Sequence, residues 1–289
     1  MRFGTVCSGI ESASCAFPSD WKLEWTSEIN PFCAALIKER YPNATNLGDL
    51  TKISCVPACD LIVAGTPCQS FSVQGRGKGL DDARGQLAIQ FTKLLSSSRP
   101  RWVIWENVPG VLRTNGGRDF GAFLKSLGQC GYGIAYRVLD ARYFGSAARR
   151  RRVFVVGHFA DWKRPAAVLF DGTQHRANAV EVEEIRQREF ATTDGTESVL
   201  GWTGDETPKY GVEIAPTIRS QQGGEGIGVI RGRTIRRFTI NELEQMQGLE
   251  HGYTHLPNAS DAIRRTAIGN AFCANVLKWI ANRIDAIDG

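Results

Sequence analysis

The sequence predicts an α/β protein with a doubly wound, mostly parallel sheet. Short apolar segments alternate with amphipathic ones over the first 157 residues, which is the order expected of strands joined by helices. The apolar segment at residues 61–63 has no polar/apolar alternation, as is typical of a strand buried on both faces of a parallel sheet. Several such segments run directly into a glycine, a cysteine or an acidic residue, at the strand ends where open α/β sheets bind ligands.

The individual elements follow from the same pattern. Asn30 and Pro31 form a cap and first-turn pair for the second helix, and Thr239 and Glu242 have the spacing of a capping box. Strands are expected over residues 2–7, 23–27, 61–64, 102–105, 135–141 and 152–157, and helices over residues 12–16, 32–41, 86–97, 117–129, 239–248 and part of 261–287.

The domain organisation follows from a change in composition near residue 160. Residues 160–230 are polar and have no steady period, which indicates a small irregular segment used for recognition. The apolar helix near residue 287 is expected to pack back on the sheet. We therefore predict a larger domain of residues 1–157 and 259–289, and a smaller recognition domain of residues 158–258.

Bulk composition excludes several classes of protein. Of the 289 residues 42% are hydrophobic and 22% charged, which is ordinary for a soluble domain, and no apolar run approaches the ~18 residues of a membrane span. The eight cysteines are scattered, and no second Cys or His pair with zinc spacing follows Cys55 and Cys59. We expect a cytoplasmic protein with reduced thiols, no metal and no membrane partner. Its formal charge is +5, with arginines concentrated at 149–152 and 231–237, which indicates contact with phosphate backbones.

Cys68 is the candidate nucleophile. Gly65 and Pro67 end the strand before it, and a glycine-rich basic segment, residues 73–84, follows it and suits a mobile lid over a polyanion. The alternative is that Cys68 is a buried small hydrophobe, as most free cysteines are.

Two acidic residues stand at predicted strand ends. Glu28 follows the second strand, where a carboxylate commonly binds ribose hydroxyls, although it could equally be a solvated strand-end charge. Glu106 follows the strand at 102–105, and a carboxylate there is costly to bury unless it is paired or used. The glycine turn at residues 8–11 lets a ligand approach a helix N-terminus, and because no G-x-G-x-x-G is present a dinucleotide is not favoured.

These residues together resemble the DNA cytosine-5 methyltransferases, in particular the phage and bacterial members. The resemblance covers about residues 1–158 and 231–289. The matching segments, in family order, are Cys7-Ser-Gly-Ile10, Glu28, Asp49, Thr66-Pro-Cys-Gln69, Glu106-Asn-Val108, Arg149–Arg152, Thr239–Gly248 and Gly269-Asn-Ala271.

The resemblance implies a Rossmann-like fold, S-adenosyl-L-methionine as cofactor and double-stranded DNA as partner. The thiolate of Cys68 would add to carbon 6 of a flipped-out cytosine, and Glu106 would hold the ring with a pKa raised by burial. The implied catalytic residues are Cys68, Glu106, Arg150, Arg152 and Asn107. The implied cofactor-binding residues are Cys7, Ser8, Gly9, Ile10, Glu28, Ile29, Asp49, Leu50, Pro67, Leu87, Asn270 and Ala271. The implied DNA-binding residues are Ser72, Arg76, Lys78, Arg84, Arg219, Gln221, Gln222, Arg233 and Arg236.

The sequence departs from the family pattern at a few positions. Ala147 and Ala148 stand where the family usually has Pro and Gln, Thr66 where it often has Pro, and Glu11 at the second glycine of the first motif. An altered cofactor or product is therefore conceivable. The competing functions are an RNA (tRNA) cytosine-5 methyltransferase and a catalytically inactive DNA-binding relative. The family default is a monomer, and phage-encoded and restriction-modification members are the expected relatives; the target sequence cannot be deduced.

Overall fold

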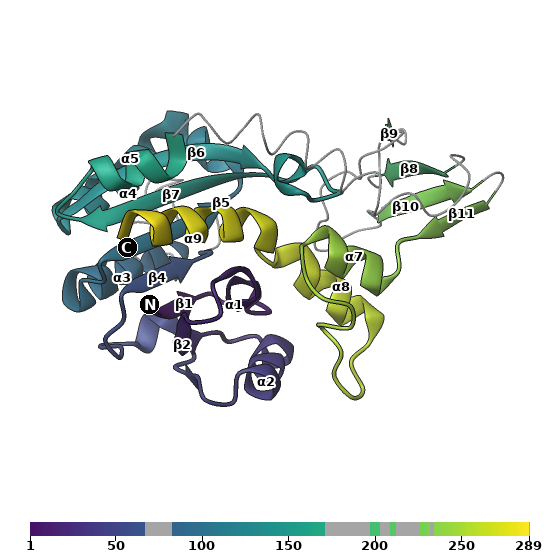
Figure 1. The fold of residues 1–289 in the computed structure, drawn as a ribbon, viewed down its shortest axis with the longest axis horizontal. Helices are drawn as coiled ribbons and strands as arrows, with labels where there is room; N and C mark the ends of the chain where they lie inside the picture. Colours follow the sequence, from purple (N-terminus) through teal and green to yellow (C-terminus); the bar gives the residue numbers. More distant parts are fainter. Residues whose placement is uncertain (67–82, 171–196, 203–208, 212–225, 232–233, 289) are drawn as a thin grey trace. The chain divides into compact units, whose positions relative to one another are not determined.

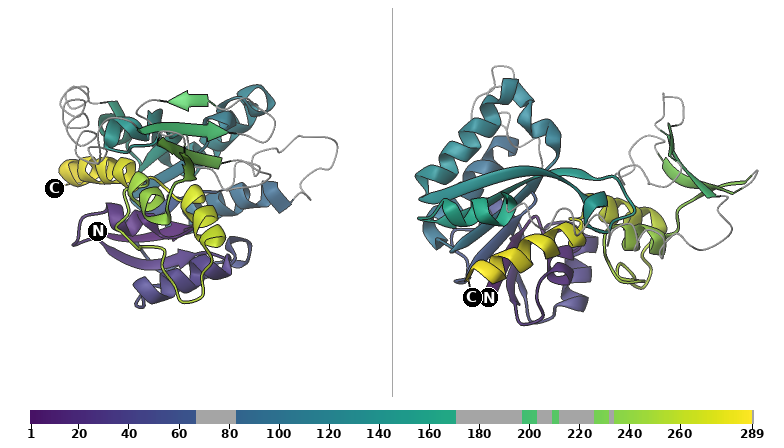
Figure 2. Two further views of the ribbon diagram at one scale, coloured as in Figure 1. Left: turned by 90° about the vertical axis from the view of Figure 1, so that its right-hand side faces the viewer. Right: turned by 45° about the horizontal axis from the view of Figure 1, so that its top comes forward.

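The structure is a computed structural model that describes residues 1–66, 83–170, 197–202, 209–211, 226–231 and 234–288. The chain forms two compact units. The first contains residues 1–139, 152–171 and 280–289, and the second contains residues 140–151 and 172–279. Figure 1 shows the elements and Figure 2 gives two further views.

A seven-stranded sheet organises the first unit, in the order β3-β2-β1-β4-β5-β7-β6. Its strands are β1 (Arg2–Val6), β2 (Lys22–Ser27), β3 (Thr45–Asn46), β4 (Leu61–Ala64), β5 (Trp102–Asn107), β6 (Tyr132–Asp140) and β7 (Arg151–Phe159). All pairings from β3 to β5 are parallel, whereas β7 runs antiparallel to β5. The predicted mostly parallel α/β sheet is therefore confirmed.

Helices and short 3-10 turns connect these strands. The α-helices are α1 (Ser12–Ala16), α2 (Pro31–Arg40), α3 (Ala83–Ser98), α4 (Arg118–Gln129), α5 (Lys163–Phe170) and the C-terminal α9 (Ala274–Asp288), and the 3-10 helices are η1 (Leu50–Lys52), η3 (Pro109–Leu112), η4 (Thr114–Gly117) and η5 (Ala141–Phe144). The predicted cap of α2 is confirmed, because the Asn30 side chain accepts hydrogen bonds from the N–H groups of Phe32 and Cys33.

One face of the sheet forms a continuous apolar core with α3 and α4. Alternate residues of the central strands point to this face, because successive side chains of a strand point to opposite sides. The cluster includes Trp25, Ile62 and Trp105 from the strands with Phe91 of α3 and Phe123 of α4. The close approach is tightest at Gly4, where an added Cβ would lie 2.1 Å from the Trp25 ring, so only glycine fits there.

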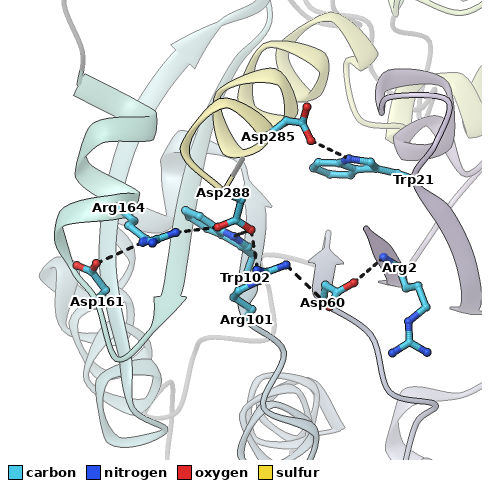
Figure 3. Close-up of polar contacts among 9 residues, drawn as sticks. All are labelled: Arg2, Trp21, Asp60, Arg101, Trp102, Asp161, Arg164, Asp285 and Asp288. Atoms are coloured by element: carbon cyan, nitrogen blue, oxygen red, sulfur yellow. Dashed lines mark hydrogen bonds and ion pairs between the residues drawn. The ribbon is translucent and has the colours of Figure 1, made fainter.

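The C-terminal helix α9 is fixed to the opposite, amino-terminal edge of the sheet by polar contacts (Figure 3). The carboxylate of Asp288 accepts a hydrogen bond from the Trp102 indole at 2.9 Å and pairs with Arg164 at 2.8 Å and Arg101 at 3.3 Å. Asp285, on the same helix, accepts from the Trp21 indole at 3.3 Å. These contacts explain why the last residues of the chain belong to the first unit, as the sequence predicted for this apolar helix.

The second unit contains a four-stranded antiparallel sheet and two helices. The sheet has the order β11-β10-β8-β9, with strands β8 (Glu197–Trp202), β9 (Lys209–Gly211), β10 (Gly226–Arg231) and β11 (Thr234–Arg237), and the helices are α7 (Ile240–Met246) and α8 (Asp261–Asn270). The capping box predicted at Thr239 and Glu242 is present at the start of α7. The buried Glu244 accepts from the N–H groups of Gly252 and Thr254 and pairs with Arg264, which ties the loop between the helices to α7.

The division by contacts differs from the predicted domain boundaries in two places. Helix α5, expected in the recognition domain, belongs to the first unit, where the carbonyls of Ala167 and Val168 accept from Arg283 of α9. Residues 259–279, expected with the larger domain, cluster with the second unit. Strands β8–β11 and α5 lie where the polar sequence gave no steady period. Within the described part of the chain, no helix combines the length and apolarity needed to cross a membrane.

Candidate active site

The first part of the candidate site is the turn between β1 and α1. Gly9 has a positive φ of 57°, and an added Cβ there would meet nothing within 4 Å, so the backbone is open to a neighbouring group. The Gly9 N–H donates to Glu28 Oε2 at 2.7 Å, and the Asn30 N–H donates to Glu28 Oε1 at 2.7 Å. The two oxygens of Glu28 are therefore held in fixed directions at the carboxyl end of β2.

A side-chain amide links Glu28 to the next turn. Asn46 Oδ1 accepts from the N–H of Glu28 at 3.1 Å and of Gly48 at 3.1 Å, and Asn46 Nδ2 donates to the Glu28 carbonyl at 3.0 Å. Asp49 follows this turn and accepts from the N–H and hydroxyl of Thr51. These hydrogen bonds hold the pKa of Asp49 below its usual value. Asn46 thus braces two carboxylates that the sequence singled out, although the sequence analysis did not name it.

The other predicted cofactor residues differ in accessibility. The Ile29 side chain is 72% exposed beside Glu28, which makes it available to a planar apolar group. By contrast Leu50 is 2% exposed and Leu87 packs partly buried against the same core, while Ser8 and Ile10 are buried. Their contact with the cofactor stays a prediction, and Pro67 lies outside the described residues.

Cys7 is unsuited to be a nucleophile. Burial, together with the nearby Glu28 and Asp49, raises the pKa of the Cys7 thiol to about 12. Burial also raises the pKa of Cys33 to about 12 and of Cys59 to about 11. These thiols stay protonated at neutral pH, and only a thiolate is an effective nucleophile. The proposed nucleophile, Cys68, lies outside the described residues.

Glu11, a departure from the family pattern, is fully buried beneath the β1–α1 turn. It has a positive φ of 57°, where the matching family position holds glycine. Its carboxylate accepts from the Thr5 hydroxyl at 2.6 Å and the Ser14 hydroxyl at 3.0 Å. Burial raises the pKa of Glu11 to about 7, against the opposing effect of these hydrogen bonds. The side chain is therefore engaged with β1 and α1.

The second part of the site is the carboxyl end of β5. Glu106 is 9% exposed, and its Oε1 lies 3.1 Å from Nε of Arg152 on the adjacent strand β7. Breaking such a buried ion pair from one side would leave an uncompensated charge. The structure therefore brings together two predicted catalytic residues that are 46 positions apart in the chain.

The residues on either side of Glu106 bind the end of β4. Asn107 Nδ2 donates to the Thr66 carbonyl at 2.8 Å, and the Trp105 indole N–H donates to Thr66 Oγ1 at 2.9 Å. Asn107 was predicted to support Glu106, and the observed contact is instead with Thr66. The sequence analysis noted Thr66 only as a departure, and its link to Trp105 is a tertiary contact that no local pattern signals.

Arg150, also predicted as catalytic, lies in the second unit and is 3% exposed. Its guanidinium donates to the carbonyl of Gly269 at 3.1 Å and of Ala271 at 2.6 Å. Arg150 thus joins two segments matched to the family, and its contact with a base or phosphate stays a prediction. The predicted cofactor residues Asn270 and Ala271 are exposed and buried, respectively.

The other features of this arginine-rich segment also find partners inside the second unit. Arg149, whose side chain is 59% exposed, lies 3.8 Å from the Asp140 carboxylate. Ala148 is 2% exposed, and its N–H donates to Ser146 Oγ, so a glutamine there would need room that the alanine does not leave.

Most of the predicted DNA contacts cannot be placed. Arg236 forms a two-pronged ion pair with Glu242, at 2.9 and 2.8 Å, beside the cap of α7. Arg84 is in α3, but its side chain is outside the described part. Ser72, Arg76, Lys78, Arg219, Gln221, Gln222 and Arg233 also lie outside the described residues.

Comparison with known proteins decides the family. A sequence model of the C-5 cytosine-specific DNA methylases matches residues 1–178. The chain belongs to this family. The match covers the segments around Glu28, Asp49, Glu106 and Arg152, so the site described above is the part of this methylase that the family shares.

Two relatives illustrate the range of similar proteins. A DNA N-6-adenine-methyltransferase of Escherichia phage P1 is 37% identical over 233 residues, which cover 61% of this methylase and 31% of the relative. The methylase therefore spans about a third of that relative's length. The type II methyltransferase M2.BsuMI of Bacillus subtilis is 28% identical over 282 residues, which cover 91% of this chain and 69% of the relative.

Solved structures share the fold. The Dnmt2 methyltransferase of S. pombe has a TM-score of 0.71 at 17% identity, with 100% of both chains covered. The Entamoeba histolytica methyltransferase EhMeth has a TM-score of 0.68 at 14% identity, with 100% of this methylase and 99% of that chain covered. These likenesses confirm the Rossmann-like fold expected from the sequence. No group of three or more His, Cys, Asp or Glu side chains that could hold a metal ion is found in the part of the methylase that the structure describes.

Proposed function

We propose that this methylase is a DNA (cytosine-5)-methyltransferase that modifies a flipped-out cytosine in a specific duplex sequence. The observation that carries the proposal is the buried pair of Glu106 and Arg152 at the carboxyl end of β5, the edge where α/β sheets bind substrates. It stands next to Thr66, two positions before Cys68 in the sequence.

The chemistry follows from what cytosine lacks. Carbon 5 is too weak a nucleophile to accept a methyl group directly, and addition of the Cys68 thiolate to carbon 6 converts one hard step into easier ones. As the carbon–sulfur bond forms, Glu106 offers a proton to ring N3, and electron density moves to carbon 5. After carbon 5 is methylated, loss of its proton and cleavage of the carbon–sulfur bond restore the aromatic ring and the thiolate. Arg152 orients Glu106 throughout by its guanidinium contact.

The cofactor in this proposal is S-adenosylmethionine, which when bound supplies a methyl group activated by a positive sulfonium. Glu28 has both oxygens fixed by backbone N–H groups and suits a ribose diol, and the exposed Ile29 suits one face of an adenine ring. Asp49 stays charged and can accept from an amine. The open space at Gly9 leaves room for the cofactor against the backbone.

The central test is a covalent adduct with duplex DNA that contains 5-fluorocytosine. Fluorine cannot leave as the proton does, so the adduct persists and can be resolved by denaturing electrophoresis. We expect an adduct for the wild-type protein and none for Cys68→Ala. Bisulfite sequencing of DNA from expressing cells would report activity and target sequence together, and a complete absence of protected cytosines would contradict the proposal.

A second candidate is methylation of adenine at N6, and the identity with the phage P1 relative, named for that activity, favours it. An adenine enzyme needs no cysteine that adds to a base, so Cys68→Ala would leave its methyl transfer intact. Hydrolysis of labelled DNA to nucleosides distinguishes 5-methylcytosine from N6-methyladenine. Parallel assays with tRNA and duplex DNA test the RNA alternative, and DNA binding without methyl transfer would identify an inactive binding protein. A monomer, the cytoplasmic location and a paired restriction enzyme stay predictions.

A further inference from the structure

The segment that precedes Cys68 is held by a buried hydrogen bond between two side chains. Thr66 is 2% exposed and Trp105 is fully buried, and the indole N–H of Trp105 donates to Thr66 Oγ1 at 2.9 Å. The Trp105 ring packs against Phe123, with centroids 4.6 Å apart, which fixes the direction of its N–H. This bond joins the end of β4 to the end of β5.

A second hydrogen bond makes the attachment directional. The Asn107 amide donates to the Thr66 carbonyl at 2.8 Å, so both the side chain and the peptide plane of residue 66 are fixed. Trp105 and Asn107 flank Glu106, and successive side chains of a strand point to opposite faces. Strand β5 therefore grips residue 66 from one face and carries the Glu106 carboxyl on the other.

The grip extends along the chain because of Pro67. Its ring fixes φ near about −65°, so one adjustable torsion separates the peptide plane held by Asn107 from the α-carbon of Cys68. A change at residue 66 is thus passed to residue 68 with little chance of local compensation.

We propose that the Trp105–Thr66 hydrogen bond positions Cys68 relative to Glu106, which makes Thr66 a positioning residue for the covalent step. The inference rests on the proposed function. It also gives a reason for threonine at position 66: a proline has no hydroxyl to accept from the buried indole. Thr66 and Trp105 are then a matched pair, and each is exchangeable only together with the other.

The test measures the single-turnover rate of adduct formation with 5-fluorocytosine DNA, with cofactor affinity and DNA affinity measured separately. Thr66→Val keeps the shape of the side chain and removes the acceptor, and we expect a rate loss of about 100-fold, the cost of a displacement of about 1 Å at a reacting group. Thr66→Ser keeps the hydroxyl and should react close to the wild-type rate. Thr26→Val is the matched control, since Thr26 is a fully buried threonine of the same sheet.

Two double variants separate positioning from simple destabilisation. Trp105→Phe should lose rate much as Thr66→Val does, and combining them should add little further loss, since both remove one interaction. Thr66→Pro should be nearly inactive with Trp105 present and regain rate with Trp105→Phe. Affinities for cofactor and DNA should stay at wild-type values throughout.

The outcomes decide between the two proposals. A wild-type protein without any adduct overturns the proposed function, and this inference with it. A wild-type adduct combined with a Thr66→Val rate equal to that of Thr26→Val overturns the inference alone, as do losses that multiply in the double variant. If Thr66→Val fails to fold by circular dichroism, the rates of Thr66→Ser and Trp105→Phe decide: equal rates for these two would overturn the inference.

Discussion

The contacts of Asp288 predict a measurable difference between two aspartates of α9. In the native protein the Asp288 side chain is 7% exposed and accepts from the fully buried Trp102 at 2.9 Å. Asp288→Ala removes that acceptor, and a buried unsatisfied donor costs about 1–3 kcal/mol. Arg164 and Arg101 are 40% and 47% exposed, so each lost ion pair adds less than about 1 kcal/mol. The expected total is about 2–4 kcal/mol.

Asp285 provides the matched control. It also accepts from an indole, that of Trp21, but at 3.3 Å, and it is exposed to water (Figure 3). Water can replace this acceptor, so Asp285→Ala should cost less than about 1 kcal/mol. Thermal unfolding followed by circular dichroism should show a decrease of about 5–10 °C for Asp288→Ala, at roughly 2–4 °C per kcal/mol, with an intermediate value for Asp288→Asn. Equal, small decreases for both alanine variants would refute the burial argument.

Three further predictions follow from other contacts. The pKa of Glu11 is raised to about 7 from 4.5, so the folded state holds a proton that the unfolded state has lost, and stability should fall as the pH rises from 4.5 to 7, by up to about 3 kcal/mol; urea titrations of wild type and Glu11→Gln should diverge across this window, and parallel curves would contradict the assignment. Asn46→Ala should raise the KM for S-adenosylmethionine about tenfold, equivalent to about 1.4 kcal/mol, without changing kcat, whereas Asn43→Ala, in the same exposed loop, should change neither. Arg150→Met should lower the melting temperature, because it abandons two buried carbonyls, but leave the salt dependence of DNA binding unchanged; Arg149→Met should do the reverse, with the slope reduced by about 0.9 if that side chain meets a phosphate.

Local sequence patterns predicted most of the elements of the first unit. Unbroken apolar runs such as Trp102–Trp105 became buried strands, and the caps at Asn30 and Thr239 are present as expected. These features depend on neighbouring residues and on backbone geometry, so they can be read along the chain. The second unit was predicted less well, because strands β8–β11 lie in a polar segment with neither helical nor strand periodicity.

The sequence by itself determined the kind of fold, the order of the family segments, and the acidic residues at the strand ends. Only the tertiary structure decided how those residues are used. It paired Glu106 with Arg152, turned Arg150 toward the carbonyls of Gly269 and Ala271, and joined Trp105 to Thr66. Periodicity reports which face of an element is apolar, whereas the partner of a buried polar group depends on strand order and on the antiparallel β7, which local patterns do not encode.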